Sequence, residues 1–213
     1  MFDAYLQKRA VERGEPFRSF EIATDYRLYV DGKPRFDGVR DFLASREIEL
    51  PEGSADDRPQ AETIRGLGNQ KNGLVNQAIE EGGVKPYEGS VRLVHQLRKR
   101  GLKIAVVTSS QNCAAVLRAV NLDDCFDVRV DGNTIRAEGL AGKPAPDTFL
   151  AAARELGVAP ARAVVVEDAI SGIQAGCAGK FGLVIGVARK GNAAELRRHG
   201  AHFVVNDLGE LVD

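Results

Sequence analysis

The stretch VVVEDAISGIQAG, residues 164–176, joins three valines to two adjacent acids and then to a Gly- and Ala-rich segment. The valines predict a strand buried on both faces, because a parallel sheet covered by helices contains continuous apolar runs. The segment after the acids predicts a short helix over 170–180. Glu167 and Asp168 would then stand at the carboxyl end of a strand, where ligands bind in open α/β sheets.

The sequence around this stretch alternates between strand and helix patterns throughout the C-terminal half. This alternation predicts an α/β fold with a Rossmann-like, doubly wound parallel sheet over residues 86–213. Strands are expected at 102–107, 161–166, 181–188 and 201–206, and a strand followed by a turn at 126–132. Helices are expected at 111–122, 146–157, 170–180 and 193–200, the second of them closed by Gly157.

The N-terminal half has a different character. Amphipathic helices are predicted at 1–13, 36–47 and 69–82, and the connections between them are rich in Gly, Pro and Asp. No continuous Val/Ile strand occurs there. We therefore predict a small helical domain over residues 1–85, followed by a linker in KPYEGS (85–90).

The amino-acid composition argues against several classes of function. Of 213 residues, 44% are hydrophobic and the formal net charge is −1, which favours a folded core and argues against a general nucleic-acid binder. No apolar run approaches the roughly 20 residues that span a bilayer. The three cysteines are far apart and form no CxxC pair, as is typical of a reduced, cytoplasmic protein. We expect a monomer that binds neither nucleic acid nor membrane.

Three polar signals lie at or near expected strand ends. They are the hydroxyls of Thr108, Ser109 and Ser110, then Lys143 in GLAGKPAPD, and the pair Glu167 and Asp168. Each also has a simpler interpretation, respectively a helix N-cap, a surface lysine in a turn and a helix cap. Together they predict phosphoryl chemistry, because hydroxyls and lysine bind phosphate and a carboxylate pair binds Mg²⁺.

Other phosphate-binding folds fit the sequence less well. Around Gly142 and Lys143, Ala137 stands where a P-loop needs its first glycine, and Pro144 replaces the Ser or Thr. No GxGxxG follows a strand. In receiver domains the acids come first in the chain, whereas here they come last.

The order of a hydroxyl, a lysine and an acid pair resembles the haloacid dehalogenase superfamily of phosphohydrolases. VVTSSQN (106–112), GKPAPDTF (142–149) and VVVEDAISGIQAG resemble its core motifs. In the helical half, VDGKPRFDGVRDFL (30–43) and GLGNQKN (66–72) resemble the cap domain of beta-phosphoglucomutase-like members. The resemblance covers nearly the whole chain.

This resemblance implies roles for individual residues. Thr108 and Lys143 would bind the transferring phosphoryl group, and Glu167 and Asp168 would hold Mg²⁺. Arg35 would bind the distal phosphate of a small sugar phosphate. The substrate side would comprise Lys71, Asn72, Ser109, Ser110, Gln111 and Asn112. Gln111 departs from the basic residue often found at its position, which puts the sugar-phosphate contacts there in doubt.

One motif of that family has no counterpart in the 213 residues. The family begins with an apolar strand ending in DxDx[TV], whose first Asp is the nucleophile. We therefore expect the central strand of the sheet to be missing, through a late start, a truncation or decay of the gene. The implied activity is that of a Mg²⁺-dependent phosphomutase or phosphatase, inactive in the chain as given. The alternatives are a non-catalytic phosphate-ligand binder and a fragment without its own function.

Overall fold

The computed structural model describes residues 1–212, which form two compact units. Unit 1 comprises Met1–Asp31 and Arg35–Gln77, and unit 2 comprises Gly32–Pro34 and the chain from Ala78 onward. The contacts therefore divide the chain differently from the predicted boundary near residue 85. Residues 32–34 and 78–85 pack with unit 2.

Unit 1 is helical, as the sequence pattern predicts. Its elements are α1 (Phe2–Arg13), the π-helical segment η1 (Ile22–Val30), α2 (Arg35–Ser45) and α3 (Ile64–Glu80), whose end extends past the unit. Rings of Phe2, Phe20 and Phe42 form the centre of its core, with centroids 4.4–4.9 Å apart. The segment η1 lies where the sequence predicts a connection between two helices.

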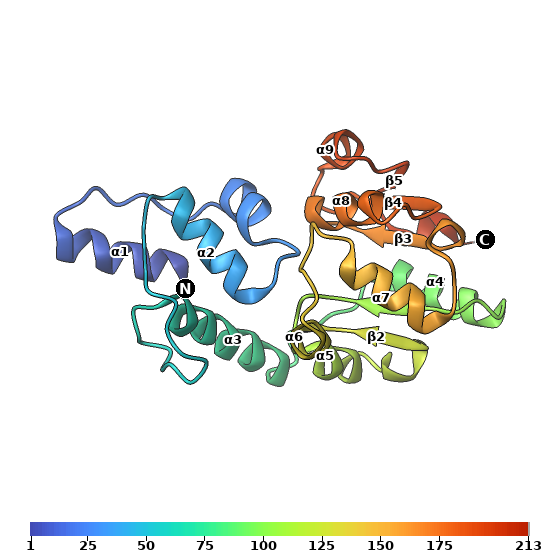
Figure 1. Cartoon of the computed structure of the whole chain (residues 1–213), viewed down its shortest axis with the longest axis horizontal. Helices are drawn as coiled ribbons and strands as arrows, with labels where there is room; N and C mark the ends of the chain where they lie inside the picture. The colour runs from blue at the N-terminus through green and yellow to red at the C-terminus, as the bar shows by residue number, and fades with distance from the viewer. Residues whose placement is uncertain (213) are drawn as a thin grey trace. The chain divides into compact units, whose positions relative to one another are not determined.

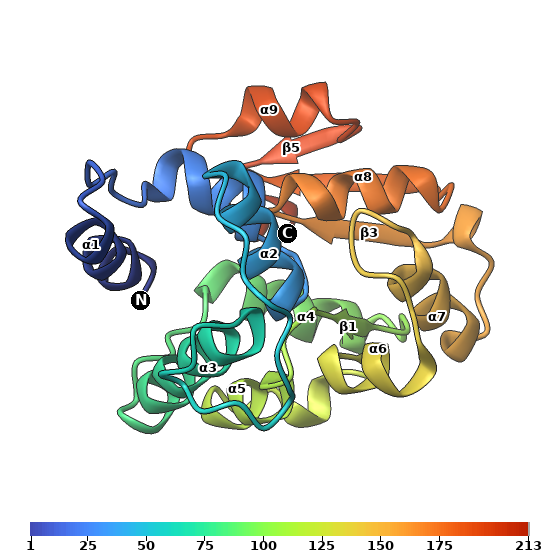
Figure 2. The same ribbon diagram turned by 60° about the vertical axis from the view of Figure 1, so that its left-hand side comes forward.

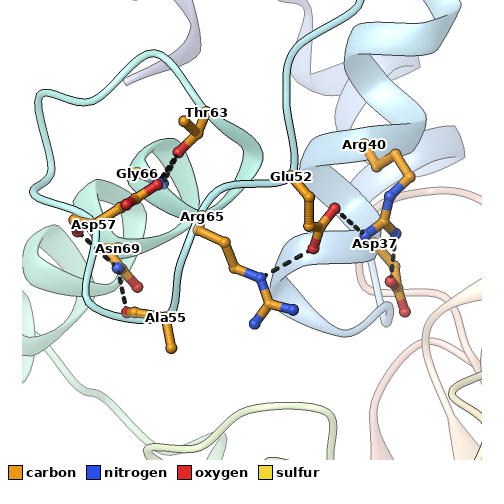
Figure 3. A network of polar contacts seen from close by, with 9 residues as sticks. All are labelled: Asp37, Arg40, Glu52, Ala55, Asp57, Thr63, Arg65, Gly66 and Asn69. Atoms are coloured by element: carbon orange, nitrogen blue, oxygen red, sulfur yellow. Dashed lines mark hydrogen bonds and ion pairs between the residues drawn. The ribbon is translucent and has the colours of Figure 1, made fainter.

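Polar contacts hold the long segment between α2 and α3 in place (Figure 3). Glu52 accepts from Arg40 Nη2 at 2.9 Å and from Arg65 Nε at 3.0 Å, so one carboxylate links α2 to α3. Asn69 Nδ2 donates to the carbonyls of Ala55 and Asp57, both at 3.0 Å. These hydrogen bonds tie the connection to both helices.

Unit 2 carries the α/β fold (Figure 1). Its strands are β1 (Ala105–Val107), β2 (Val128–Val130), β3 (Val164–Glu167), β4 (Leu183–Val187) and β5 (Phe203–Val205). Its α-helices are α4 (Glu88–Lys99), α5 (Cys113–Ala119), α6 (Gly132–Glu138), α7 (Asp147–Leu156), α8 (Ile170–Ala178) and α9 (Ala193–Arg198). Short 3-10 turns are η2 (Asp123–Cys125), η3 (Pro160–Arg162) and η4 (Leu208–Leu211). Each predicted strand and helix of this half is present, and Gly157 ends α7 with φ 67° as expected.

The strands form two parallel ladders rather than one continuous sheet. β1 pairs with β2, with Val107 opposite Val130. β3 pairs with β4, which pairs with β5, in the order β3-β4-β5. Within residues 1–212, β1 and β3 each pair on one edge only. The gap agrees with a parallel sheet that lacks its central strand. The prediction that β3 is buried on both faces is wrong, because Val164 is 54% and Val166 40% exposed.

Helices connect the two ladders within unit 2 (Figures 1 and 2). α7 packs on β1, β2 and α8, and α8 packs on β3 and β4. The core beneath them centres on Val165, Ile173 and Val184, and Val107 of β1 packs against the same cluster. Among the described residues no helix is long and apolar enough to cross a membrane.

Candidate functional site

The segment after β1 carries the three hydroxyl residues of the predicted phosphate site. The N–H of Thr108 still donates to the carbonyl of Val130 at 2.9 Å, so the residue extends the ladder by one bond. Its hydroxyl accepts from the N–H of Ser110 at 3.2 Å, and the Ser110 hydroxyl accepts from the N–H of Asn112 at 3.1 Å. Asn112 is the N-cap of α5, with no side-chain cap bond among described residues. The hydroxyls therefore shape a turn and do not cap the helix.

Gln111 and Asn112 complete this turn, and both are half-buried. The carbonyl of Gln111 accepts from Asn133 Nδ2 at 3.2 Å. A Cβ on Gly132 would lie 2.8 Å from Gln111 Cγ, so the start of α6 packs directly on the turn. The predicted substrate residues 108–112 thus form one local structure at the carboxyl end of β1.

Gly32 brings the carboxyl ends of β1 and β3 together. Its carbonyl accepts from Ser109 Oγ at 2.9 Å. A Cβ at Gly32 would lie 2.5 Å from Ser171 Oγ and 2.9 Å from Ala169 Cβ, and its φ of +73° also favours glycine. The sequence predicts only a Gly- and Pro-rich connection at residues 31–34 and gave no signal for this contact.

Lys143 is buried beside the carboxyl end of β3. It is 6% exposed, and its Nζ donates to Glu167 Oε1. The same Nζ lies 4.7 Å from the ring centroid of Phe149 in α7. The simpler interpretation of Lys143 as a surface lysine is therefore wrong, and two of the three polar signals meet in one ion pair.

The two acids after β3 differ in their partners. The Glu167 side chain is 10% exposed and also accepts from the N–H of Ala169 at a long 3.4 Å. The carboxylate of Asp168 takes no hydrogen bond or ion pair from any residue of the described chain. Its backbone carbonyl accepts from Nδ2 of buried Asn192 at 3.5 Å, a neighbour that sequence reasoning missed.

The predicted Mg²⁺ ligands do not make a metal site by themselves. Residues 1–212 contain no group of three or more His, Cys, Asp or Glu side chains placed to hold a metal ion. Glu167 is already paired with Lys143, which leaves Asp168 as the one free carboxylate of the pair. Because Mg²⁺ is octahedral and takes oxygen ligands, the described residues alone do not fit it.

The three predicted residues of unit 1 lie together. Arg35 begins α2, and its Nη2 donates to Asn72 Oδ1 of α3 at 2.7 Å. The two helices meet closely at Gly68, where a Cβ would lie 2.5 Å from the Phe36 ring. Burial lowers the pKa of Lys71, and the positive charge of Arg35 lowers it further, while Asp31 acts in the opposite direction. Unit 1 therefore presents two adjacent cations suited to an anionic group.

Sequence comparisons match the chain to known proteins over its whole length. Residues 3–179 match the family described as "Hydrolase: haloacid dehalogenase-like hydrolase". A beta-phosphoglucomutase of Mycobacterium bovis is 53% identical over 215 residues, covering 100% of this chain and 82% of that protein. A beta-phosphoglucomutase of Bacillus subtilis is 38% identical over 51% of this chain and 46% of its own length.

Solved structures share the fold. A hydrolase from Pseudomonas syringae aligns with a TM-score of 0.75 at 22% identity, over 98% of this chain and 87% of that one. A beta-phosphoglucomutase from Clostridium difficile gives 0.70 at 20% identity, over 99% and 85%. The protein CbbY from Rhodobacter sphaeroides, in complex with xylulose-(1,5)bisphosphate, gives 0.68 at 23% identity, over 98% and 88%.

Proposed function

Because the chain belongs to the haloacid dehalogenase-like hydrolase family, we propose that its fold serves phosphoryl transfer on a small sugar phosphate, as a phosphomutase or phosphatase. The observation that carries this proposal is the buried Lys143–Glu167 pair beside the unpartnered carboxylate of Asp168. A buried ion pair costs desolvation and is weak evidence for stability, which favours a functional reason for its position. The sugar-phosphate substrate class is supported by the mycobacterial relative, which matches this chain from end to end.

Each polar group has a proposed role. Thr108 and Lys143 hold the oxygens of the transferring phosphoryl group, since a hydroxyl donates a hydrogen bond and a buried ammonium offsets phosphate charge. The hydroxyls and amides of Ser109, Ser110, Gln111 and Asn112 support the substrate from the same turn. In unit 1, Arg35 binds the distal phosphate, and Lys71 and Asn72 stand beside it.

We also propose Mg²⁺ as the cofactor, although its coordination needs more ligands than the described residues provide. Glu167 and Asp168 would contribute oxygen ligands, and further ligands would have to come from outside the described chain.

Phosphoryl transfer in this family also needs a carboxylate nucleophile, and the described residues offer no good substitute. Asp131 follows β2, but its carboxylate accepts from the N–H groups of Asn133 and Thr134 and caps α6. Asp127 accepts from the N–H of Ile104 at 2.7 Å, and Asp207 caps η4. We therefore propose that these 213 residues by themselves bind phosphate without turning it over.

The second candidate function is that of a non-catalytic protein that binds a phosphorylated ligand. It is favoured because the carboxylates of Asp127, Asp131 and Asp207 already accept hydrogen bonds from backbone N–H groups. The two candidates share one binding test. Titration calorimetry with beta-glucose 1-phosphate should detect binding to the chain, and Thr108→Val and Lys143→Met should weaken it about tenfold or more.

Lys99→Met, which removes an exposed lysine from the last turn of α4, is the matched control and should bind as the unaltered chain does. Thr108→Val keeps the test informative if the loss of Lys143 impairs folding. Equal affinity in all four proteins would contradict the proposed phosphate site.

A further inference from the structure

The hydroxyl of Ser109 is used differently from the other hydroxyls of the turn after β1. Those of Thr108 and Ser110 each accept a hydrogen bond from a backbone N–H of the turn itself. The half-buried hydroxyl of Ser109 instead donates to the carbonyl of Gly32 at 2.9 Å, across 77 positions of the sequence. A hydroxyl has one proton to donate, so in this arrangement it is not offered to a phosphate oxygen.

Gly32 belongs to a short piece of chain that packs with unit 2, although unit 1 lies on both sides of it in the sequence. Residues 32–34 are therefore a place where the chain passes between the units. A Cβ on Gly32 would lie 2.5 Å from Ser171 Oγ and 2.9 Å from Ala169 Cβ. The backbone of this connection is thus held between the start of α8 on one side and the hydroxyl of Ser109 on the other.

The second passage between the units follows residue 77, and its unit 2 end is fastened by other residues. Arg189 Nη2 donates to Ser90 Oγ at 2.7 Å, and Arg189 Cζ lies 3.8 Å from the ring centroid of Tyr87. These contacts join the segment after β4 to the start of α4 and involve no residue of the turn after β1. Ser90 therefore offers a matched control for Ser109.

We propose that Ser109 is a positioning residue that couples phosphate binding in the turn 108–112 to the connection at 32–34. A ligand favours the conformation to which it binds, so a phosphate held by this turn keeps Ser109 directed at the Gly32 carbonyl. The coupling is reciprocal, and the anchored connection strengthens phosphate binding by the same factor. The coupling rests on the proposed function of the turn, whereas the anchoring of Gly32 in the ligand-free chain does not.

The test observes the hydrogen bond itself, through the carbonyl ¹³C resonance of Gly32 detected from the N–H of Lys33 in the full chain. Inorganic phosphate is titrated at constant ionic strength, and the backbone amides of Ser110 and Asn112 report its binding to the turn. We expect the Gly32 carbonyl to move downfield, the direction of a stronger hydrogen bond. It should saturate at the same phosphate concentration as the two amides.

Ser109→Ala removes the donor and leaves the backbone of the turn unchanged. Without phosphate, the Gly32 carbonyl of this variant should move upfield, and it should no longer follow the titration. Phosphate binding at the amides of Ser110 and Asn112 should weaken about two- to tenfold, the usual worth of one neutral hydrogen bond. Ser90→Ala, which removes a half-buried hydroxyl from the other connection, should leave both readouts unchanged.

The wild-type titration gives a sign that needs no variant. An upfield movement of the Gly32 carbonyl would mean that the Ser109 hydroxyl leaves Gly32 for the phosphate, and it would overturn the proposal. So would a carbonyl that does not respond while the amides do, or a Ser109→Ala chain that responds as the wild type does. Amides of Ser110 and Asn112 that ignore phosphate would contradict the phosphate site itself, and the coupling with it.

Discussion

At the scale of single residues, the burial of Lys143 shows that two of the polar sequence motifs of unit 2 meet in the structure. A lysine in the turn GLAGKPAPD has no sequence feature that marks it as buried. The structure places its ammonium against Glu167, with side chains 5% and 10% exposed. Both groups have left water, so removing one of them leaves the other charge uncompensated.

Lys143→Met should therefore destabilise the protein by about 3–5 kcal/mol, the usual cost of breaking a buried pair from one side. The double variant Lys143→Met/Glu167→Leu should recover most of that loss, because neither charge is then buried. Urea unfolding of the single variant, the double variant and the Lys99→Met control measures the difference. A single variant as stable as the control would show that the pair is not formed.

Lys71 gives a second residue-scale prediction, based on pH. Burial and the charge of Arg35 lower the pKa of Lys71 in the folded chain, so the unfolded chain binds this proton more tightly. The stability of the fold should therefore increase as the pH rises from the folded pKa of Lys71 to its unfolded pKa. Arg35→Gln removes the like charge and should raise the pKa of Lys71, though not fully to its ordinary value, because burial is the larger cause.

A pH titration of the ¹³Cε resonance of lysine-labelled protein measures that pKa directly. The same titration is carried out on Arg13→Gln, which removes an exposed arginine of unit 1 and should leave the pKa of Lys71 unchanged. An unchanged or lowered pKa of Lys71 in Arg35→Gln would contradict the proximity of the two cations.

At the scale of elements, the start of α8 explains why the opening stretch continues SGIQAG. A Cβ on Gly172 would lie 2.2 Å from Glu167 Cδ, and the carboxylate cannot move aside easily while Lys143 holds it. A Cβ on Gly176 would lie 3.1–3.3 Å from Val184 and Val165, which is tight but tolerable. The small residues therefore allow α8 to lie close against β3.

Gly172→Ala should cost about 1–3 kcal/mol through this overlap. The matched control is Gly73→Ala in α3, where nothing lies within 4 Å of the added Cβ and the helix should gain about 0.5–1 kcal/mol. Chemical unfolding of both variants gives the comparison. Stabilisation in both would mean that Glu167 is free to move and that α8 does not need glycine at position 172.

Local patterns predicted the succession of strands and helices in unit 2, because each element has its own apolar period. The absence of the family's first strand predicted a gap in the sheet, and within residues 1–212 β1 and β3 do pair on one edge only. β1 covers Ala105–Val107 and not the full predicted 102–107, because the bounds of a strand depend on pairing with segments far away in the chain. α6 was not predicted, and the capping box of Asp131 marks its start.

At the scale of the whole molecule, the sequence predicted which residues belong to the candidate site. It predicted only part of how these residues are arranged in space. The sequence placed Thr108, Ser109 and Glu167 at strand ends, and the structure brings those ends together. The sequence could not reveal the contacts of Gly32 and Asn192, because a contact through a backbone carbonyl or a single amide side chain leaves no recognisable sequence motif. The Mg²⁺ site stays a prediction, since the described residues supply too few ligands.

We propose that these 213 residues hold the phosphate-binding part of a phosphoryl-transfer site without its nucleophile. Loss of a covalent nucleophile typically removes many orders of magnitude of rate. The strand-flanking residues Asp127, Asp131 and Asp207 are committed to backbone hydrogen bonds and do not replace it.

The most direct test is a turnover assay of the purified chain with Mg²⁺ and either beta-glucose 1-phosphate or p-nitrophenyl phosphate. Released phosphate and glucose 6-phosphate are both measured, with the Asp168→Ala variant as the control for contaminating phosphatase. We predict that the chain and the variant are equally inactive, although the chain binds the sugar phosphate in the calorimetric titration. Turnover by the chain that Asp168→Ala abolishes would contradict the account, because a carboxylate among these residues would then have to act as the nucleophile.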